Sequence, residues 1–205
     1  MSLLRSAALI TALGLAYAPL LAQQTTLRDY EEPEAYLVYS AILSVPENSN
    51  RPVPKAYLIR GETLRTFGAF IDNAESPGGT CLKAEPASEQ RVAPAIEDFV
   101  KANGVKHRLL PRFEIATPYR LVGSESLLSL IRQDGWTSFY NKYPGVDGFI
   151  DLSAVGFNSD KTVAVVAKGR WCGDLCGEGS YYVLEKRNGR WGPMEWKGRS
   201  CSWIS

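Results

Sequence analysis

The sequence is poor in the residues on which common hydrolytic chemistries depend. It contains a single histidine, His107, so that any Ser-His or Cys-His catalytic pair would have to use this side chain. His107 stands in the basic segment GVKHRL, where a solvated or helix-capping histidine is the ordinary outcome. The sequence also lacks a G-x-S-x-G nucleophile elbow, an S-x-x-K pair and an H-E-x-x-H zinc helix. We therefore assign no catalytic residue from motifs.

An excess of charge of either sign is also missing. The chain has 23 Lys and Arg against 22 Asp and Glu, and removing Arg5 with the N-terminal segment leaves 22 against 22. No bulk charge is then available to hold a polyanion or an anionic membrane surface. The sequence therefore predicts no nucleic-acid partner.

No hydrophobic run is long enough for a comfortable membrane span. The sixteen uncharged residues 7–22 include Gly14 and Pro19 and are followed by the polar segment QQTT, whereas a transmembrane helix needs about 20 apolar residues. One basic residue before a short apolar run is typical of a secretory signal peptide. We predict a signal peptide over 1–22, a single mature α+β domain over 23–205, export to the periplasm or beyond, and no stable membrane span after cleavage.

Four cysteines, Cys81, Cys172, Cys176 and Cys201, form an even set in a chain predicted to leave the cytoplasm. Disulfides are the ordinary outcome there, and three pairings are possible. A zinc site would need closely spaced ligand pairs, but the spacing is C-x₃-C with two distant cysteines, so we predict no metal and no cofactor. We favour Cys172 with Cys176, across the neck of a hairpin, and Cys81 with Cys201. An uninterrupted register from Asn188-Gly189 would instead bring Cys201 level with Cys176.

Helices are predicted in the first two thirds of the chain. The segment 29–43 opens with acidic residues, accepts Pro33 in its first turn and places Tyr36, Tyr39 and Leu43 on one face. A second helix is expected from Pro94 to 102, with a left-handed stop at residues 103–104. A third begins near residue 124 and is interrupted at residue 135. Short strands are expected at 55–60 and 120–122.

The last third predicts antiparallel strands at 149–155, 162–168, 181–187 and 191–204. Asn188-Gly189 favours a type I′ hairpin turn because both residues tolerate a positive φ. Pro193 and Gly198 indicate bulges or an exposed edge in the final strand. The expected fold class is thus α+β, with a C-terminal four-stranded antiparallel meander. The N-terminal and central helices would cover one face, and the other face would be partly wet.

Three sequence segments carry a resemblance. They are FYNKYPGVDGFIDLSAVGFN, then CGDLCGEGSYYVLEKRNGRW, and WIS at the end of the sequence. They resemble a group of exported bacterial proteins that share FYxxYPGxxGxxxxSxVGFN, CGxLCGxG, NGxW and WxS. The resemblance implies an exported single domain and supplies no catalytic residue. Cys81 and Cys201 are not part of the shared pattern.

The glycine-rich loop 169–179 is the most unusual local feature. Its backbone N–H groups could form an anion-binding nest, with Arg170 adding charge and Trp171 a stacking surface, and Asp174 and Glu178 complete the predicted binding residues. The ordinary alternative is a disulfide-closed hairpin whose glycines supply positive φ.

Function remains open between two classes. The missing motifs favour a non-catalytic extracytoplasmic domain that binds a partner outside the cytoplasm. The alternative is a carboxylate-dependent hydrolase of cell-wall or environmental polysaccharide, which needs two suitably spaced acids. Asp147 with Asp151, and Asp174 with Glu178, are the pairs that could be proposed. The ordinary interpretation puts Asp147 in a turn and Asp151 on the wet face of a strand.

Overall fold

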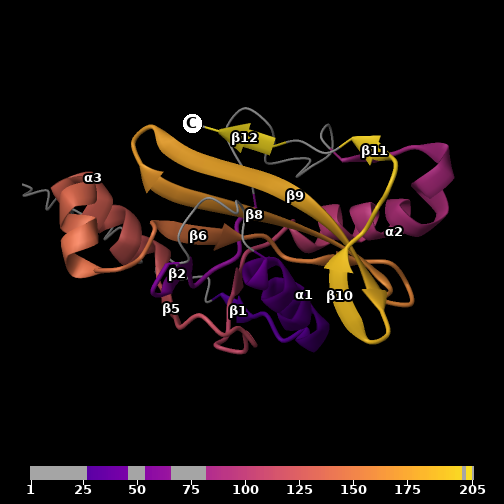
Figure 1. The fold of residues 1–205 in the computed structure, drawn as a ribbon, viewed down its shortest axis with the longest axis horizontal. Coiled ribbons are helices and arrows are strands. Elements are labelled where there is room, and N and C mark those ends of the chain that lie inside the picture. Colours follow the sequence, from indigo (N-terminus) through magenta and orange to yellow (C-terminus); the bar gives the residue numbers. More distant parts are fainter. Residues whose placement is uncertain (1–26, 46–53, 66–81, 200–201, 205) are drawn as a thin grey trace, which may run out of the picture.

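A computed structural model describes residues 27–45, 54–65, 82–199 and 202–204. The predicted signal peptide 1–22, Cys81 and Cys201 lie outside these residues. Within them, the main sheet has eight strands (Figure 1). Its central order is β10 (Arg190–Pro193), β9 (Cys176–Arg187), β8 (Val163–Gly173), β6 (Phe149–Leu152), β2 (Tyr57–Arg60) and β5 (Tyr119–Val122). Two short strands join this path: β12 (Ser202–Ile204) pairs with β9, and β7 (Gly156–Phe157) pairs with β8.

The prediction of a four-stranded antiparallel meander is not confirmed. β6, β8, β9 and β10 do pair antiparallel in chain order, but β2 pairs parallel with both β6 and β5. The two short strands expected at 55–60 and 120–122 therefore extend the C-terminal sheet into a mixed one. Parallel pairing joins segments far apart in the chain, so local sequence carries no sign of it.

Helices cover both faces of this sheet, which corrects the expectation of one wet face. Alternate residues of β8 enter different cores: Ala164 and Val166 pack in the cluster with α1 (Pro33–Ser44), and Val163 and Val165 in the cluster with α2 (Pro86–Ala102). Since successive strand residues point to opposite faces, α1 and α2 lie on opposite sides. The third helix, α3 (Ser124–Lys142), covers β2, β5 and β6 at the end away from α2 (Figure 1).

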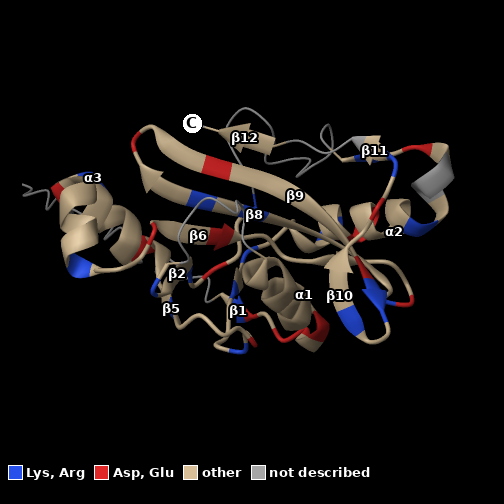
Figure 2. Ribbon diagram, viewed as in Figure 1, with Lys and Arg blue, Asp and Glu red and all other residues tan. Residues whose placement is uncertain are grey.

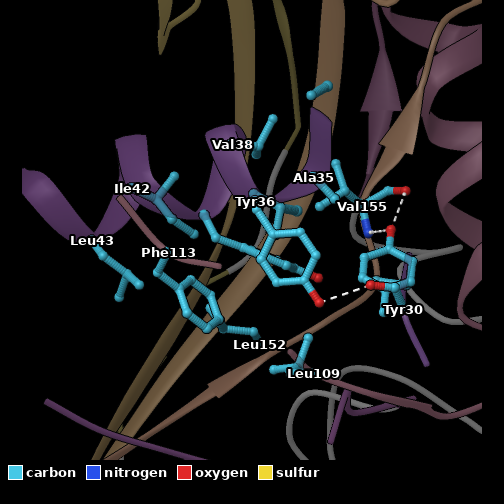
Figure 3. Close-up of a cluster of buried hydrophobic side chains, with 14 of the residues drawn as sticks. Tyr30, Ala35, Tyr36, Val38, Ile42, Leu43, Leu109, Phe113, Leu152 and Val155 are labelled. Atoms are coloured by element: carbon cyan, nitrogen blue, oxygen red, sulfur yellow. Dashed lines mark hydrogen bonds between the residues drawn. The ribbon is translucent and has the colours of Figure 1, made fainter. Parts of the chain in front are cut away.

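The helix α1 forms as the sequence predicts, and its tyrosines fix it to the sheet. Pro33 occupies the first turn, where no N–H is required. The hydroxyl of Tyr39 donates to the backbone oxygen of Ser153 at 2.6 Å. Tyr36 donates to the Tyr30 carbonyl at 2.8 Å, and both rings are buried in the apolar cluster shown in Figure 3. Each tyrosine thus buries an aromatic ring while its hydroxyl remains hydrogen-bonded.

The second helix differs from its prediction at both ends. It begins at Pro86 and contains Pro94 internally. Pro86, and not Pro94, thus occupies the favoured first-turn position. The helix stops at Asn103, which has φ −86° and is not left-handed. Instead, the buried Asn103 amide donates to the carbonyls of Phe99 and Ala154 and so ties the end of the helix to the segment between β6 and β7.

The third helix is broken where the sequence indicates a break. Gly135 has φ +72° inside α3, a conformation that favours glycine, and the helical segments continue on either side of it. Its buried residues Leu127 and Phe139 pack with Leu58 and Phe149 of the sheet. No helix among the described residues is both long and apolar enough to span a membrane.

The hairpin predictions are confirmed and extended. Asn188 and Gly189 both have positive φ, as a type I′ turn requires, between β9 and β10. β8 and β9 are longer than predicted because the glycine-rich segment continues the ladder to Gly173 and Cys176. Cys172 and Cys176 form the expected disulfide across this end, with Cα atoms 5.0 Å apart.

The final strand is split. β10 pairs with β9 in the register Pro193↔Leu184, whereas β12 pairs with β9 in the register Trp203↔Gly179, so that the two registers differ by five residues. Between them, β11 (Gly198–Arg199) leaves the main sheet and pairs antiparallel with β3 (Lys83–Ala84). The uninterrupted register that would place Cys201 beside Cys176 is therefore wrong.

The second predicted bridge, Cys81 with Cys201, stays a prediction. The described residues near the two cysteines are nonetheless register partners, because Arg199 pairs with Lys83. Each partner is two residues from its cysteine along the sequence. The β3–β11 ladder thus brings the two flanking segments together.

Candidate ligand-binding site

The four predicted binding residues surround the closed end of the β8–β9 hairpin but do not converge. Arg170 and Glu178 are register partners and share a face. Trp171 is the next residue on β8 and so points to the opposite face. Asp174 is exposed in the turn itself. The structure therefore joins Arg170 with Glu178 and separates the other two.

Arg170 is surrounded by carboxylates. Its guanidinium lies 2.9 Å from the Glu178 carboxylate and 3.1 Å from that of Asp147. The basic and acidic segments of β8 and β9 accordingly lie side by side in Figure 2. The positive charge of Arg170 is therefore neutralised by two carboxylates. The cationic, anion-binding loop that the sequence suggested is not formed.

Gly179 provides clearance for one member of a tryptophan pair. None of the described glycines between 169 and 179 has a positive φ, so neither a nest nor a turn explains them. A Cβ on Gly179 would overlap the indole of Trp203, which lies across from it on β12. Trp203 in turn packs against Trp171, with ring centroids 4.6 Å apart. The missing side chain of Gly179 therefore leaves room for the Trp203 indole.

Asp151 is buried rather than on a wet face, which corrects the sequence interpretation. Its carboxylate accepts hydrogen bonds from Arg60 at 2.6 and 3.1 Å and from the Trp171 indole at 2.8 Å. Burial raises the pKa of Asp151 to about 6, and the Arg60 guanidinium limits this rise. The fully enclosed carboxylate thus links β6 to Arg60 of β2 and to Trp171 of β8.

One cavity lies on the opposite face, the one that α1 covers. It has a volume of about 500 Å³. The walls come from the end of α1, from β8 and β9, and from the two separate strands β10 and β12. The lining residues are Ala41, Ile42, Val45, Lys168, Glu178, Gly179, Ser180, Tyr182, Val183, Leu184, Trp191, Gly192, Pro193, Ser202, Trp203 and Ile204. We call this cavity the β9 pocket.

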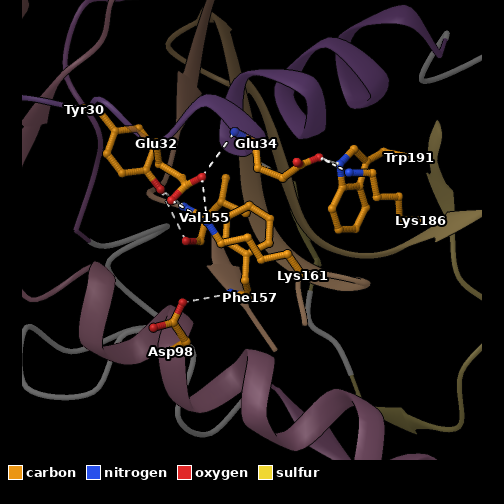
Figure 4. Close-up of polar contacts among 9 residues, drawn as sticks. All are labelled: Tyr30, Glu32, Glu34, Asp98, Val155, Phe157, Lys161, Lys186 and Trp191. Carbon is orange, nitrogen blue, oxygen red and sulfur yellow. Dashed lines mark hydrogen bonds and ion pairs between the residues drawn. The ribbon is translucent and has the colours of Figure 1, made fainter. Parts of the chain in front are cut away.

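Polar contacts in the first turn of α1 fix Trp191, which lines the β9 pocket. Glu34 accepts hydrogen bonds from the Trp191 indole at 2.7 Å and from Lys186 at 2.8 Å (Figure 4). Burial alone would raise the pKa of Glu34, but these two donors lower it below the ordinary value. The hydrogen bond to Glu34 thereby fixes the Trp191 ring of β10 against α1.

A polar row crosses the pocket floor. Lys168, Ser180 and Ser202 are register partners on the adjacent strands β8, β9 and β12. The Lys168 ammonium donates to the Ile42 carbonyl in the last turn of α1 at 3.2 Å and lies 5.3 Å from the centre of the Tyr182 ring. Lys168 is only 4% exposed, so a cation is held inside a largely apolar cavity.

The remaining candidates lie elsewhere. His107 is on β4 (His107–Arg108), and its ring packs on Tyr30 with centroids 5.1 Å apart, outside the β9 pocket lining. Among the described residues, no group of three or more His, Cys, Asp or Glu is placed to hold a metal ion.

Sequence reasoning found one lining residue, Glu178, and missed the others. Alternation of Glu178, Ser180, Tyr182 and Leu184 on one face of β9 was visible in the sequence and predicts a shared surface. What the surface meets depends on α1, β10 and β12, whose placement is set by contacts between distant segments.

Comparison with known proteins adds no assignment. No protein-family model matches the chain, and no curated protein or solved structure matches it.

Proposed function

We propose that this protein is a non-catalytic extracytoplasmic binding domain that takes a small, largely apolar ligand in the β9 pocket. The observation that carries the proposal is the pocket itself. Its volume of about 500 Å³ falls among those of small-molecule sites, which are mostly apolar cavities with a few polar groups.

Exposed apolar side chains support an apolar ligand. Ile204 is 87% exposed and Val45 is 53% exposed, and both line the β9 pocket. Large aliphatic groups gain about 1.5 to 3 kcal/mol when fully removed from water. A ligand that covers Val45 and Ile204 would recover part of that free energy.

The lining also favours binding over hydrolysis. Glu178 is the only carboxylate among the described lining residues, and it is paired with Arg170 at 2.9 Å. Carboxylate-dependent glycoside hydrolysis needs two acids that flank the scissile bond. Of the acids proposed from sequence, Asp151 is enclosed on the other face and Asp174 is exposed in the turn.

Titration with Nile red, a neutral dye that fluoresces in apolar surroundings, tests the proposal. The variant Ser180→Phe places a ring on the pocket floor and should weaken dye binding at least about tenfold, equivalent to about 1.4 kcal/mol. The matched control Ser126→Phe makes the same change on an exposed position of α3 and should bind as the wild type does. Circular dichroism would establish that both variants fold.

Two results would contradict the proposal. Equal dye affinity in wild type and a folded Ser180→Phe variant would place binding outside the β9 pocket. Reproducible turnover of peptidoglycan or a polysaccharide by the purified protein would replace a binding role with the hydrolase alternative.

A further inference from the structure

The polar row on the floor of the β9 pocket points to the chemistry of the ligand. Lys168, Ser180 and Ser202 present an ammonium and two hydroxyls from three neighbouring strands. All three residues line the pocket, whose other walls are mainly aliphatic and aromatic. A cation with adjacent hydroxyl donors inside an apolar cavity is suited to a charged head on an apolar body.

The fold fixes the position of the Lys168 ammonium. Lys168 is 4% exposed, and its ammonium donates to Ile42 in the last turn of α1. That turn contains no basic residue of its own, so Lys168 also places positive charge at the negative end of the helix. Burying an ammonium is costly unless polar partners compensate it, and the Ile42 carbonyl and the Tyr182 ring are two such partners.

The neighbouring charges direct an anion toward Lys168. Glu178 lies two register pairs from the Lys168–Ser180 pair, on the same face of the sheet, and the Arg170 guanidinium lies 2.9 Å from its carboxylate. Arg170 is also 3.1 Å from Asp147. Glu178, paired with Arg170, therefore places a carboxylate on one side of the pocket lining, whereas the hydroxyls of Ser180 and Ser202 lie in register with Lys168.

We infer that the β9 pocket binds an amphiphilic carboxylate of the fatty-acid class, with its head at Lys168, Ser180 and Ser202 and its apolar chain against residues such as Val45, Leu184 and Ile204. This inference rests on the proposed function. It goes beyond the proposed function because it specifies the charge of the ligand. If Lys168 served only the end of α1, the pocket would bind charged and neutral ligands equally well.

Calorimetric titration of the native protein with dodecanoate and dodecanol separates these possibilities. At pH 8 the wild type should bind dodecanoate at least about tenfold more tightly than dodecanol, as expected of a charge-assisted hydrogen bond. Lys168→Met should remove that preference with little effect on dodecanol, and Lys168→Arg should retain it. Lys101→Met, on an exposed position of α2, is the matched control and should leave both affinities unchanged.

The outcomes are distinguishable. Equal affinity for dodecanoate and dodecanol in the wild type would overturn the carboxylate assignment, and this comparison needs no variant to fold. Equal losses for both ligands in a folded Lys168→Met variant would also overturn it. If neither ligand nor Nile red binds, the proposed function itself fails.

Discussion

The buried pair of Arg60 and Asp151 should dominate the response of this protein to single substitutions. The variant Arg60→Met keeps most of the side-chain volume but leaves the Asp151 carboxylate enclosed without its cation. Both side chains are largely buried, at 10% and 1% exposure. Removing one partner of a buried pair costs about 3 to 5 kcal/mol. We expect a loss of that size in the free energy of unfolding at pH 8.

The loss should depend on pH, because protonation relieves the unpaired carboxylate. Burial already raises the pKa of Asp151 to about 6 from its ordinary value of 3.8, and Arg60 opposes that rise. Removing Arg60 should raise this pKa further. Since the folded state then binds the proton more tightly than the unfolded chain, Arg60→Met should be less destabilised at pH 5 than at pH 8.

In the wild type, too, Asp151 makes the free energy of unfolding fall as the pH rises. A carboxyl whose folded pKa is raised contributes most stability below the unfolded value, and this contribution is lost as the pH rises through about 6. Asp151→Asn should abolish that pH-dependent component while retaining a group that can accept from the Trp171 indole.

Urea unfolding at pH 5 and pH 8 measures these effects. Arg108→Met is the control, since Arg108 pairs with Asp29 on the surface and should lose much less stability. The double variant Arg60→Met, Asp151→Leu should recover much of the loss at pH 8. A loss under about 1 kcal/mol for Arg60→Met, or the same loss at both pH values, would refute the reasoning.

Two further predictions concern covalent links and packing. Peptide mapping of unreduced protein should yield a linked Cys81–Cys201 peptide besides the hairpin bridge, and two alkylatable thiols at these positions would contradict it. Gly156→Ala should cost about 1 to 3 kcal/mol, because its Cβ would overlap the backbone of α2, whereas Gly192→Ala has open space. Equal midpoints of thermal unfolding for the two alanine variants would contradict the packing argument.

Local features of this chain were predictable where neighbouring residues specify the backbone. Pro33 begins a helix, Gly135 breaks one, and Asn188-Gly189 forms a type I′ turn, each as the sequence indicates. The Cys172–Cys176 bridge belongs to the same group, since it spans a single hairpin end. In each case the interacting groups are within a few residues of one another.

The sheet and the β9 pocket were decided by tertiary structure. Parallel pairing of β2 with β6 brings Arg60 to Asp151, and neither segment predicts the other. β10 and β12 pair with β9 in registers five residues apart and both line the pocket, and between them β11 pairs with β3. Sequence alone could place Lys168 on a strand. Its burial in a cavity depends on distant parts of the chain, because α1 and three strands must pack around it.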